Sequence, residues 1–147
     1  MKNASTAGGL RELRSSIVFE GFVSENRKEA LLKSCAMLLF PSMIEGFGIV
    51  LLEAFARNKP VVVADVRPLT EIVDDNADGF IVGSTSPSEW ADKIVLLLKN
   101  KSICSEMGAK GRGKVETRFN IAHAAKRLEA IYEEVAAMPC RVVQVQS

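Results

Sequence analysis

The segment "PSMIEGFGIVLLEAFARNKPVVVAD", residues 41–65, gives the strongest indication of the fold class. Within it, residues 48–58 have the composition and length of a helix. Residues 60–65 form a continuous apolar run that begins with proline, which is typical of a strand buried on both faces. Another strand is predicted at residues 37–42, where Pro41 ends it. Apolar strands joined by a helix predict an α/β, Rossmann-like parallel sheet with helices on both faces.

The rest of the chain continues this alternation. Ser24 and Asn120 precede helical segments and are expected to cap them, and Ser86 with Glu89 has the spacing of a capping box around Pro87. We expect a loosely ordered lead-in at residues 1–16, one domain at 17–138 and a tail at 139–147. Further strands are predicted at residues 16–23 and 80–83, and further helices at 25–36, 69–73, 86–100, 102–119 and 120–137.

The carboxyl ends of the strands are where a ligand crevice is expected, because open parallel sheets bind ligands there. The loops after Val23, Ser42 and Asp65 should therefore share one edge of the sheet. Arg67 lies in the third loop and Glu71 lies after it. From the sequence, each of the two could contact a ligand or have a surface or capping role.

Composition narrows the function classes. The net charge of +1 gives no electrostatic argument for a nucleic-acid partner, and no apolar run approaches the roughly 20 residues of a membrane helix. We therefore expect a cytoplasmic protein with at most peripheral membrane association. The three cysteines have no CxxC spacing and only His123 to assist them, which favours free thiols over a disulfide or a metal site.

The candidate ligand-binding residues lie between Glu45 and Glu53. Gly46 and Gly48 flank Phe47 at the predicted start of a helix, so a phosphate could approach main-chain N–H groups there. Glu45, beside that anion pocket, suits hydroxyl groups of a ligand better than phosphate. Glu53 falls among apolar residues, where a carboxylate needs hydrogen-bond donors or a cation, and the hydroxyls of a ribose would serve. The two glutamates would then bracket a nucleotide sugar.

A simpler alternative exists for the same residues. Glu45 could be an ordinary helix-start charge, and Glu53 could pair with Arg57 four residues later. The basic segment 110–114, "KGRGK", is expected to be a solvated helix face, and Trp90 is expected to pack in the core. The spacing alone leaves both interpretations of the glutamates open.

The order of motifs over residues 17–133 resembles the donor-binding half of retaining glycosyltransferases of the GT-B fold, in the large family-four group. The family's pair of glutamates separated by seven residues is similar to Glu45 and Glu53. The resemblance implies transfer of a hexose from a nucleotide-diphospho-sugar to a glycan or lipid-linked acceptor, with retention of configuration and without a required metal or cofactor. The motifs are "VFEGFVS", "LLFPSMIEGFGIVLLEAFA", "PVVVADVRPLTEIV", "ADGFIV" and "FNIAHAAKRLEAIY".

The resemblance also implies roles for individual residues. Glu45 would be the catalytic residue that contacts the donor sugar, and Glu53 would bind the ribose. The expected donor-binding residues are Phe22 and Val23 at the base, Gly46, Phe47 and Gly48 at the diphosphate, and Ile49 beside them.

Two features of the family have no counterpart before residue 17: the amino-terminal acceptor domain, and the first donor-domain strands with their Arg and Lys clamp on the diphosphate. We therefore expect this chain to be the carboxyl-terminal part of a transferase, with the amino-terminal half on another chain as its expected partner. The alternatives are a non-catalytic nucleotide-sugar-binding subunit, an inactive fragment, and a sugar epimerase of similar fold. Asn58 and Ile121 replace the family's usual glycine and aromatic residue.

Overall fold

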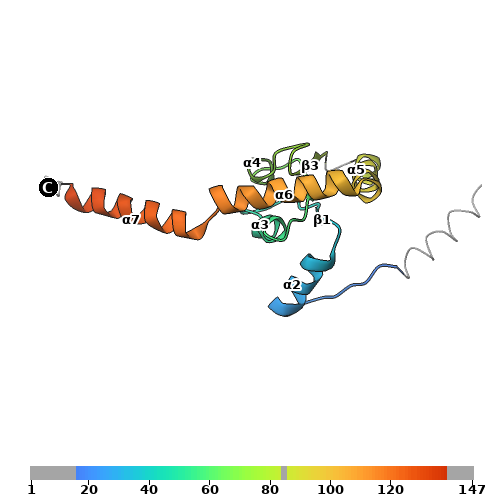
Figure 1. Cartoon of the computed structure of the whole chain (residues 1–147), viewed down its shortest axis with the longest axis horizontal. Helices are drawn as coiled ribbons and strands as arrows, with labels where there is room; N and C mark the ends of the chain where they lie inside the picture. Colours follow the sequence, from blue (N-terminus) through green and yellow to red (C-terminus); the bar gives the residue numbers. More distant parts are fainter. Residues whose placement is uncertain (1–15, 84–85, 139–147) are drawn as a thin grey trace, which may run out of the picture. The chain divides into compact units, whose positions relative to one another are not determined.

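The computed structural model describes residues 16–83 and 86–138. The chain divides into two compact units, residues 1–31 and 32–147. Most of the predicted lead-in, the whole predicted tail and Cys140 lie outside the described residues. The elements, in chain order (Figure 1), are α2 (Glu25–Ser34), β1 (Leu38–Phe40), α3 (Ile49–Phe55), β2 (Val61–Ala64), α4 (Leu69–Ile72), β3 (Gly79–Val82), α5 (Pro87–Lys99), α6 (Lys101–Arg118) and α7 (Ile121–Ala137).

The prediction of a strand at residues 16–23 is wrong. This segment has no regular secondary structure, and Val18 and Phe19 are 75% and 93% exposed. β-Branched and aromatic residues favour a strand only where a neighbouring strand pairs with it, and none of the three described strands does so. The predicted cap that follows is confirmed, because Ser24 Oγ accepts a hydrogen bond from the Arg27 N–H at 3.3 Å.

The sheet of the second unit is parallel, with strand order β1-β2-β3. Leu39 pairs with Val62, which pairs in turn with Phe80. All four residues of β2 are fully buried. This confirms the predicted α/β, Rossmann-like class and the prediction that residues 60–65 contain a strand buried on both faces.

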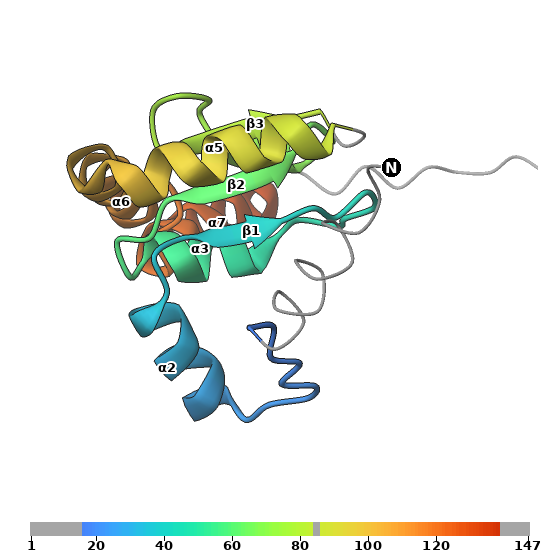
Figure 2. The ribbon, with the colours of Figure 1, turned by 90° about the vertical axis from the view of Figure 1, so that its right-hand side faces the viewer.

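Two apolar clusters cover the two faces of this sheet. Val61 and Val63 pack with α3 and α4, whereas Val62 packs with α5, because successive strand side chains point to opposite faces. Figure 2 shows α3 and α5 on opposite sides of the sheet. The sheet is thus a middle layer, and both of its faces are removed from water.

Helix α6 packs closely against α3 because it carries small residues where the two helices meet. A Cβ at Gly108 would lie 2.0 Å from the Asn58 carbonyl oxygen, and a Cβ at Gly111 would lie 2.2 Å from the Phe55 ring. Asn58 itself has φ 55°, the predicted left-handed conformation beyond α3. The close contact fixes the position of α3, and with it the loop before α3.

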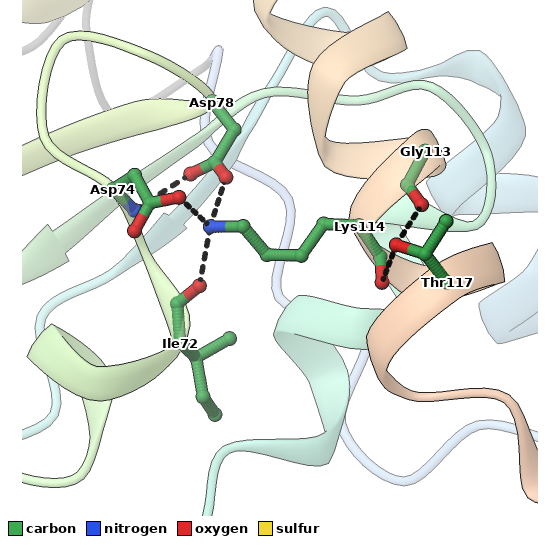
Figure 3. Close-up of polar contacts among 6 residues, drawn as sticks. All are labelled: Ile72, Asp74, Asp78, Gly113, Lys114 and Thr117. Atoms are coloured by element: carbon green, nitrogen blue, oxygen red, sulfur yellow. Dashed lines mark hydrogen bonds and ion pairs between the residues drawn. The ribbon is translucent and has the colours of Figure 1, made fainter. Parts of the chain in front are cut away.

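A polar network, buried at Lys114 and Asp78 and exposed at Asp74, connects α6 to the turn after α4 (Figure 3). The Lys114 ammonium donates to the Ile72 carbonyl at 2.8 Å and forms ion pairs with Asp74, at 2.7 Å, and with Asp78. Burial raises the pKa of the Asp78 carboxyl, and the bond from Lys114 opposes that shift. The expectation that segment 110–114 is a solvated face is therefore wrong for Lys114, whose side chain is only 12% exposed.

The two remaining helix starts differ in their caps. Pro87 opens α5 as predicted, but the Ser86 side chain makes no capping hydrogen bond and lies 3.4 Å from Ser88 Oγ instead, so the predicted capping box is wrong. Asn120 Oδ1 accepts from the Ala122 N–H at 2.9 Å, which confirms the cap of α7. None of the described helices is both long and apolar enough to cross a membrane.

Candidate functional site

The carboxyl edge of the sheet carries the loop that contains the predicted site. Residues 41–48 leave β1 and enter α3, and residues 65–68 leave β2 at the same edge because the strands are parallel. Two of the three loops predicted for this edge are thus confirmed there. The loop after Val23 is not one of them, because residues 16–23 do not form a strand.

Gly48 sets the turn into α3. It has φ 88°, and a Cβ at this position would lie 2.9 Å from Leu69 Cδ2. Gly46 differs, because nothing lies within 4 Å of the position its Cβ would take. Gly48 is therefore required by the fold of the chain, whereas the space beside Gly46 is open to a ligand.

The loop presents a carboxylate beside main-chain donors. Glu45 Oε1 accepts a hydrogen bond from the Gly46 N–H at 3.1 Å. Within the described residues, the N–H groups of Phe47 and Gly48 make no hydrogen bond. Helix α3 is shorter than predicted, at seven residues. An anion in this loop would therefore be bound by main-chain N–H donors rather than by the dipole of a long helix.

Glu53 lies at the edge of the apolar face of α3. Leu51, Ala54 and Phe55 are buried, but Glu53 is only half-buried. Its setting is thus less apolar than the sequence suggested. Arg57 donates from Nη1 to the main-chain carbonyl of Glu53 at 2.8 Å, a bond to the backbone of Glu53.

An aromatic contact anchors the loop to the end of α6. The rings of Phe47 and Phe119 meet edge to face, with their centroids 6.3 Å apart. The ring of Phe47 is thereby turned toward α6, while its main chain stays available in the loop. The sequence does not predict this contact, because 71 residues separate the two rings along the chain and no spacing rule connects them.

The other predicted site residues are less closely gathered. Arg67 and Glu71 form an exposed ion pair, with Nε and Oε1 3.6 Å apart, which is a surface role. Ile49, the first residue of α3, is exposed beside the loop. Phe22 and Val23 belong to the first unit, and their contact with a base stays a prediction.

Pockets in the described part of the second unit include two that the glutamates do not line. One, of about 410 Å³, lies beside β1 at the carboxyl edge, where Leu39 and Pro41 meet the first turns of α5. Trp90 lines it and donates from Nε1 to the Gly83 carbonyl at 3.3 Å, while packing on the core as predicted. The second pocket, of about 420 Å³, lies at the amino ends of the strands, between the free cysteines Cys35 and Cys104.

The surroundings of Cys35 shift the pKa of its thiol. Burial raises the pKa of the Cys35 thiol, and the nearby Lys59 opposes the shift. Among residues 16–83 and 86–138, no three His, Cys, Asp or Glu side chains gather as metal ligands. The chemistry that the structure does assemble is therefore the carboxylate and main-chain donors of residues 45–48.

This arrangement, a parallel sheet with a Glu-Gly-Phe-Gly turn at its carboxyl edge, can be compared with known proteins. The family described as "Glycosyl transferases group 1" matches residues 8–114. The chain belongs to this family. The resemblance to GT-B glycosyltransferases predicted from the motif order is thus confirmed, and the group 1 match includes Glu45, Glu53 and Lys114.

Relatives of this group 1 glycosyltransferase chain include a phosphatidyl-myo-inositol mannosyltransferase of Mycobacterium leprae. It is 33% identical over 139 residues, which cover 94% of this chain and 36% of the mannosyltransferase. The chain spans about a third of the length of the curated relatives it matches first.

Solved structures show the same fold. Sucrose-phosphate synthase from Thermosynechococcus elongatus superposes with a TM-score of 0.79 at 24% identity, covering 90% of this chain and 34% of the synthase. HepE from Anabaena, solved in complex with UDP, gives a TM-score of 0.72 at 21% identity, covering 92% of this chain and 39% of HepE. At these sequence identities, the superpositions show that the fold is shared, and they give no evidence about which ligands this chain binds.

Proposed function

We propose that this chain is the donor-binding half of a retaining hexosyltransferase that uses a nucleotide-diphospho-sugar. The acceptor is a glycan or a lipid-linked sugar, and no metal is required. The proposal includes a cytoplasmic location with at most peripheral membrane association. An amino-terminal half that supplies the acceptor site completes the enzyme, on another chain or in the part of the relatives that this chain does not span.

The loop of residues 45–48 is the observation that carries the proposal. It offers the Phe47 and Gly48 N–H groups as donors, places a carboxylate beside them, and leaves open space at Gly46. Main-chain N–H groups bind phosphate oxygens, and a carboxylate accepts from sugar hydroxyls. A sugar attached through a diphosphate presents both groups together, so one ligand satisfies both ends of this loop.

Family membership supports the same choice. The mannosyltransferase of M. leprae is named for transfer of a hexose to a lipid, and HepE was solved with UDP. We take a hexose and a uridine, guanosine or adenosine diphosphate as the candidates for this chain. Glu53, half-buried in the second turn of α3, is our candidate for the ribose hydroxyls.

In the reaction we propose, the main chain at Gly46, Phe47 and Gly48 binds the diphosphate and orients it as leaving group. Glu45 holds the sugar by its hydroxyls, and the donor phosphate assists deprotonation of the acceptor. The loops 41–48 and 65–68 contain a single cation, Arg67, which is already paired with Glu71. Charge stabilisation of the leaving diphosphate must therefore come largely from elsewhere, and the chain alone is expected to bind donor better than it transfers sugar.

The test is calorimetric titration of the chain with UDP, GDP and ADP. Saturable binding of one nucleotide is expected, weakened at least about tenfold by Glu53→Ala. Glu106→Gln, a change on the exposed face of α6, is the control and should leave binding unchanged. A folded chain that binds none of the three nucleotides, or a Glu53→Ala variant that binds as well as the parent, would contradict the proposal.

The second candidate is a non-catalytic donor-binding subunit, favoured by the same shortage of cations at the crevice loops. The two are separated by adding an amino-terminal half from a group 1 relative to the chain and supplying donor and acceptor. A hexosyltransferase half should restore transfer that Glu45→Gln abolishes, with the product anomer matching that of the donor. Nucleotide binding without transfer would favour the subunit, and release of an isomeric sugar nucleotide would identify an epimerase.

A further inference from the structure

Two contacts from other elements restrain the loop of residues 45–48. Gly48 is held from the side of α4, because Leu69 Cδ2 lies only 2.9 Å from the position of a Cβ at Gly48. Phe47 is held from the side of α6, where its ring meets the ring of Phe119 edge to face, with the centroids 6.3 Å apart. These are the same two residues whose N–H groups make no hydrogen bond within the described residues. Each of these donors therefore belongs to a residue that a neighbouring element holds in place.

Phe119 is attached to a helix that is itself fixed. It caps the carboxyl end of α6, where its N–H donates to the Val115 carbonyl at 3.2 Å. Close packing at Gly111 and the bonds of Lys114 hold α6 to α3 and to the turn after α4. The Phe119 side chain is partly buried against the core, and Cζ of Arg118 lies 5.2 Å from the centre of its ring. The ring thus gives the loop a fixed surface to pack against.

Main-chain donors bind an anion tightly only when they are oriented before the anion arrives. A loop that is free to move must be ordered on binding, and the lost conformational entropy reduces the affinity. The Phe47 side chain is 44% exposed and lies in a segment without regular secondary structure, so its contact with Phe119 restrains a loop that has little local order of its own. An edge-to-face ring pair is strong enough to change an affinity about fivefold when the pair is removed.

We propose that Phe119 is a positioning residue for nucleotide binding. Its ring holds Phe47 so that the N–H groups of Phe47 and Gly48 stay oriented toward the diphosphate, while Phe119 itself does not touch the ligand. The inference rests on the proposed function, because that proposal places the diphosphate at this loop. The end of α6, far along the chain from the Glu-Gly-Phe-Gly turn, thereby becomes part of what sets the affinity for the donor.

The first measurement needs no ligand and follows the backbone of the loop by NMR relaxation of the isotope-labelled chain. Phe119→Leu keeps an apolar side chain but removes the ring, so the amide order parameters of Phe47 and Gly48 should fall from about 0.85 toward about 0.6. Phe47→Leu breaks the same contact from the partly exposed loop, where the change should leave the fold intact. The double variant F47L/F119L should be no more mobile than either single variant, because one contact is lost only once.

The second measurement is calorimetric titration of the same variants with UDP, GDP and ADP. For the nucleotide that the parent chain binds, Phe119→Leu and Phe47→Leu should each weaken binding about fivefold. The double variant F47L/F119L should also be weakened only about fivefold, since the two rings act through one contact. Losses that multiply in the double variant would show that the rings act separately, and that result would overturn the proposal.

Ile103→Ala is the matched control, because it removes as many side-chain carbon atoms from the same helix as Phe119→Leu does. Ile103 packs with the apolar cluster on the other face of the sheet, so its loss should lower stability in urea without changing nucleotide affinity or the order of the loop.

The outcomes separate this inference from the proposed function. A parent chain that binds none of the three nucleotides would contradict the proposed function. In a chain that does bind one, unchanged order parameters or unchanged affinity in Phe119→Leu would overturn the role of Phe119 alone. Equal weakening of binding by Ile103→Ala would also overturn it, because the effect would then reflect stability rather than the ring contact.

Discussion

Gly46 and Gly48 lie in the same turn, but only Gly48 is expected to be needed for stability. Gly48 has φ 88° and its Cβ position lies against Leu69, so Gly48→Ala should lower the free energy of unfolding by about 1–3 kcal/mol. Gly46→Ala adds a methyl group in open space, so the free energy of unfolding should change by less than about 0.5 kcal/mol. Urea unfolding followed by circular dichroism measures both values.

The same pair of variants tests the position of the diphosphate. If phosphate oxygens approach the main chain at Gly46, the methyl group of Gly46→Ala should weaken nucleotide binding about tenfold, by calorimetry, in a chain as stable as the parent. A folded Gly46→Ala variant with undiminished nucleotide affinity would exclude that approach. Loss of stability in Gly46→Ala would instead show that the added methyl group strains the turn.

At the scale of one residue, the sequence predicted the start of α3 better than it predicted the burial of Glu53. The sequence placed Gly46 and Gly48 at the start of a helix, and Gly48 is the residue before α3, with a φ of 88° that glycine tolerates. The apolar neighbours of Glu53 in the sequence suggested a buried carboxylate, yet Glu53 is half-buried. Burial depends on which flank of α3 meets the sheet and α6, and that is set by residues such as Gly111, far along the chain.

At the scale of elements, the network around Lys114 gives the strongest prediction about stability. Lys114→Met removes the ammonium that serves Asp74, Asp78 and the Ile72 carbonyl, and leaves the Asp78 carboxyl buried without its cation. Breaking a buried ion pair from one side destabilises by about 3–5 kcal/mol, so the midpoint of urea unfolding should fall sharply. The measurement is urea unfolding of the variant beside the parent chain.

Lys110→Met is the matched control, because Lys110 is exposed on the same helix, four residues away. It should change the free energy of unfolding by less than about 0.5 kcal/mol. The double variant K114M/D78N removes charge from both sides and should recover part of the loss. A Lys114→Met variant as stable as Lys110→Met would mean that the network contributes nothing to holding α6 in place.

Elements were predictable where the signal is local. Helix α7 and its cap at Asn120, and strand β2 with its four consecutive apolar residues, follow from composition and spacing alone. The strand expected at residues 16–23 failed because strand formation needs a neighbour, and no local pattern reports whether one is present. The prediction of a solvated face fails at Lys114 for the same reason, although two glycines inside a helix, Gly108 and Gly111, are themselves a sign of close packing.

At the scale of the whole chain, the two compact units should differ in local stability. The amides of β2 are held in a fully buried strand paired on both sides, so they should exchange with deuterium only when the second unit unfolds globally. Residues 17–20 have no regular structure and exposed side chains, so their amides should exchange almost as fast as in an unfolded peptide. Hydrogen exchange followed by mass spectrometry compares the two segments in one sample.

Adding the nucleotide that binds extends this comparison to the site. Binding should slow exchange at residues 45–50, because the ligand then occupies the N–H groups of Phe47 and Gly48, and it should leave α7 unchanged. If residues 17–23 also become protected on binding, Phe22 and Val23 contact the base, as the family resemblance implies. If they are protected without ligand, the segment pairs with another part of the chain in solution, and the predicted fast exchange is contradicted.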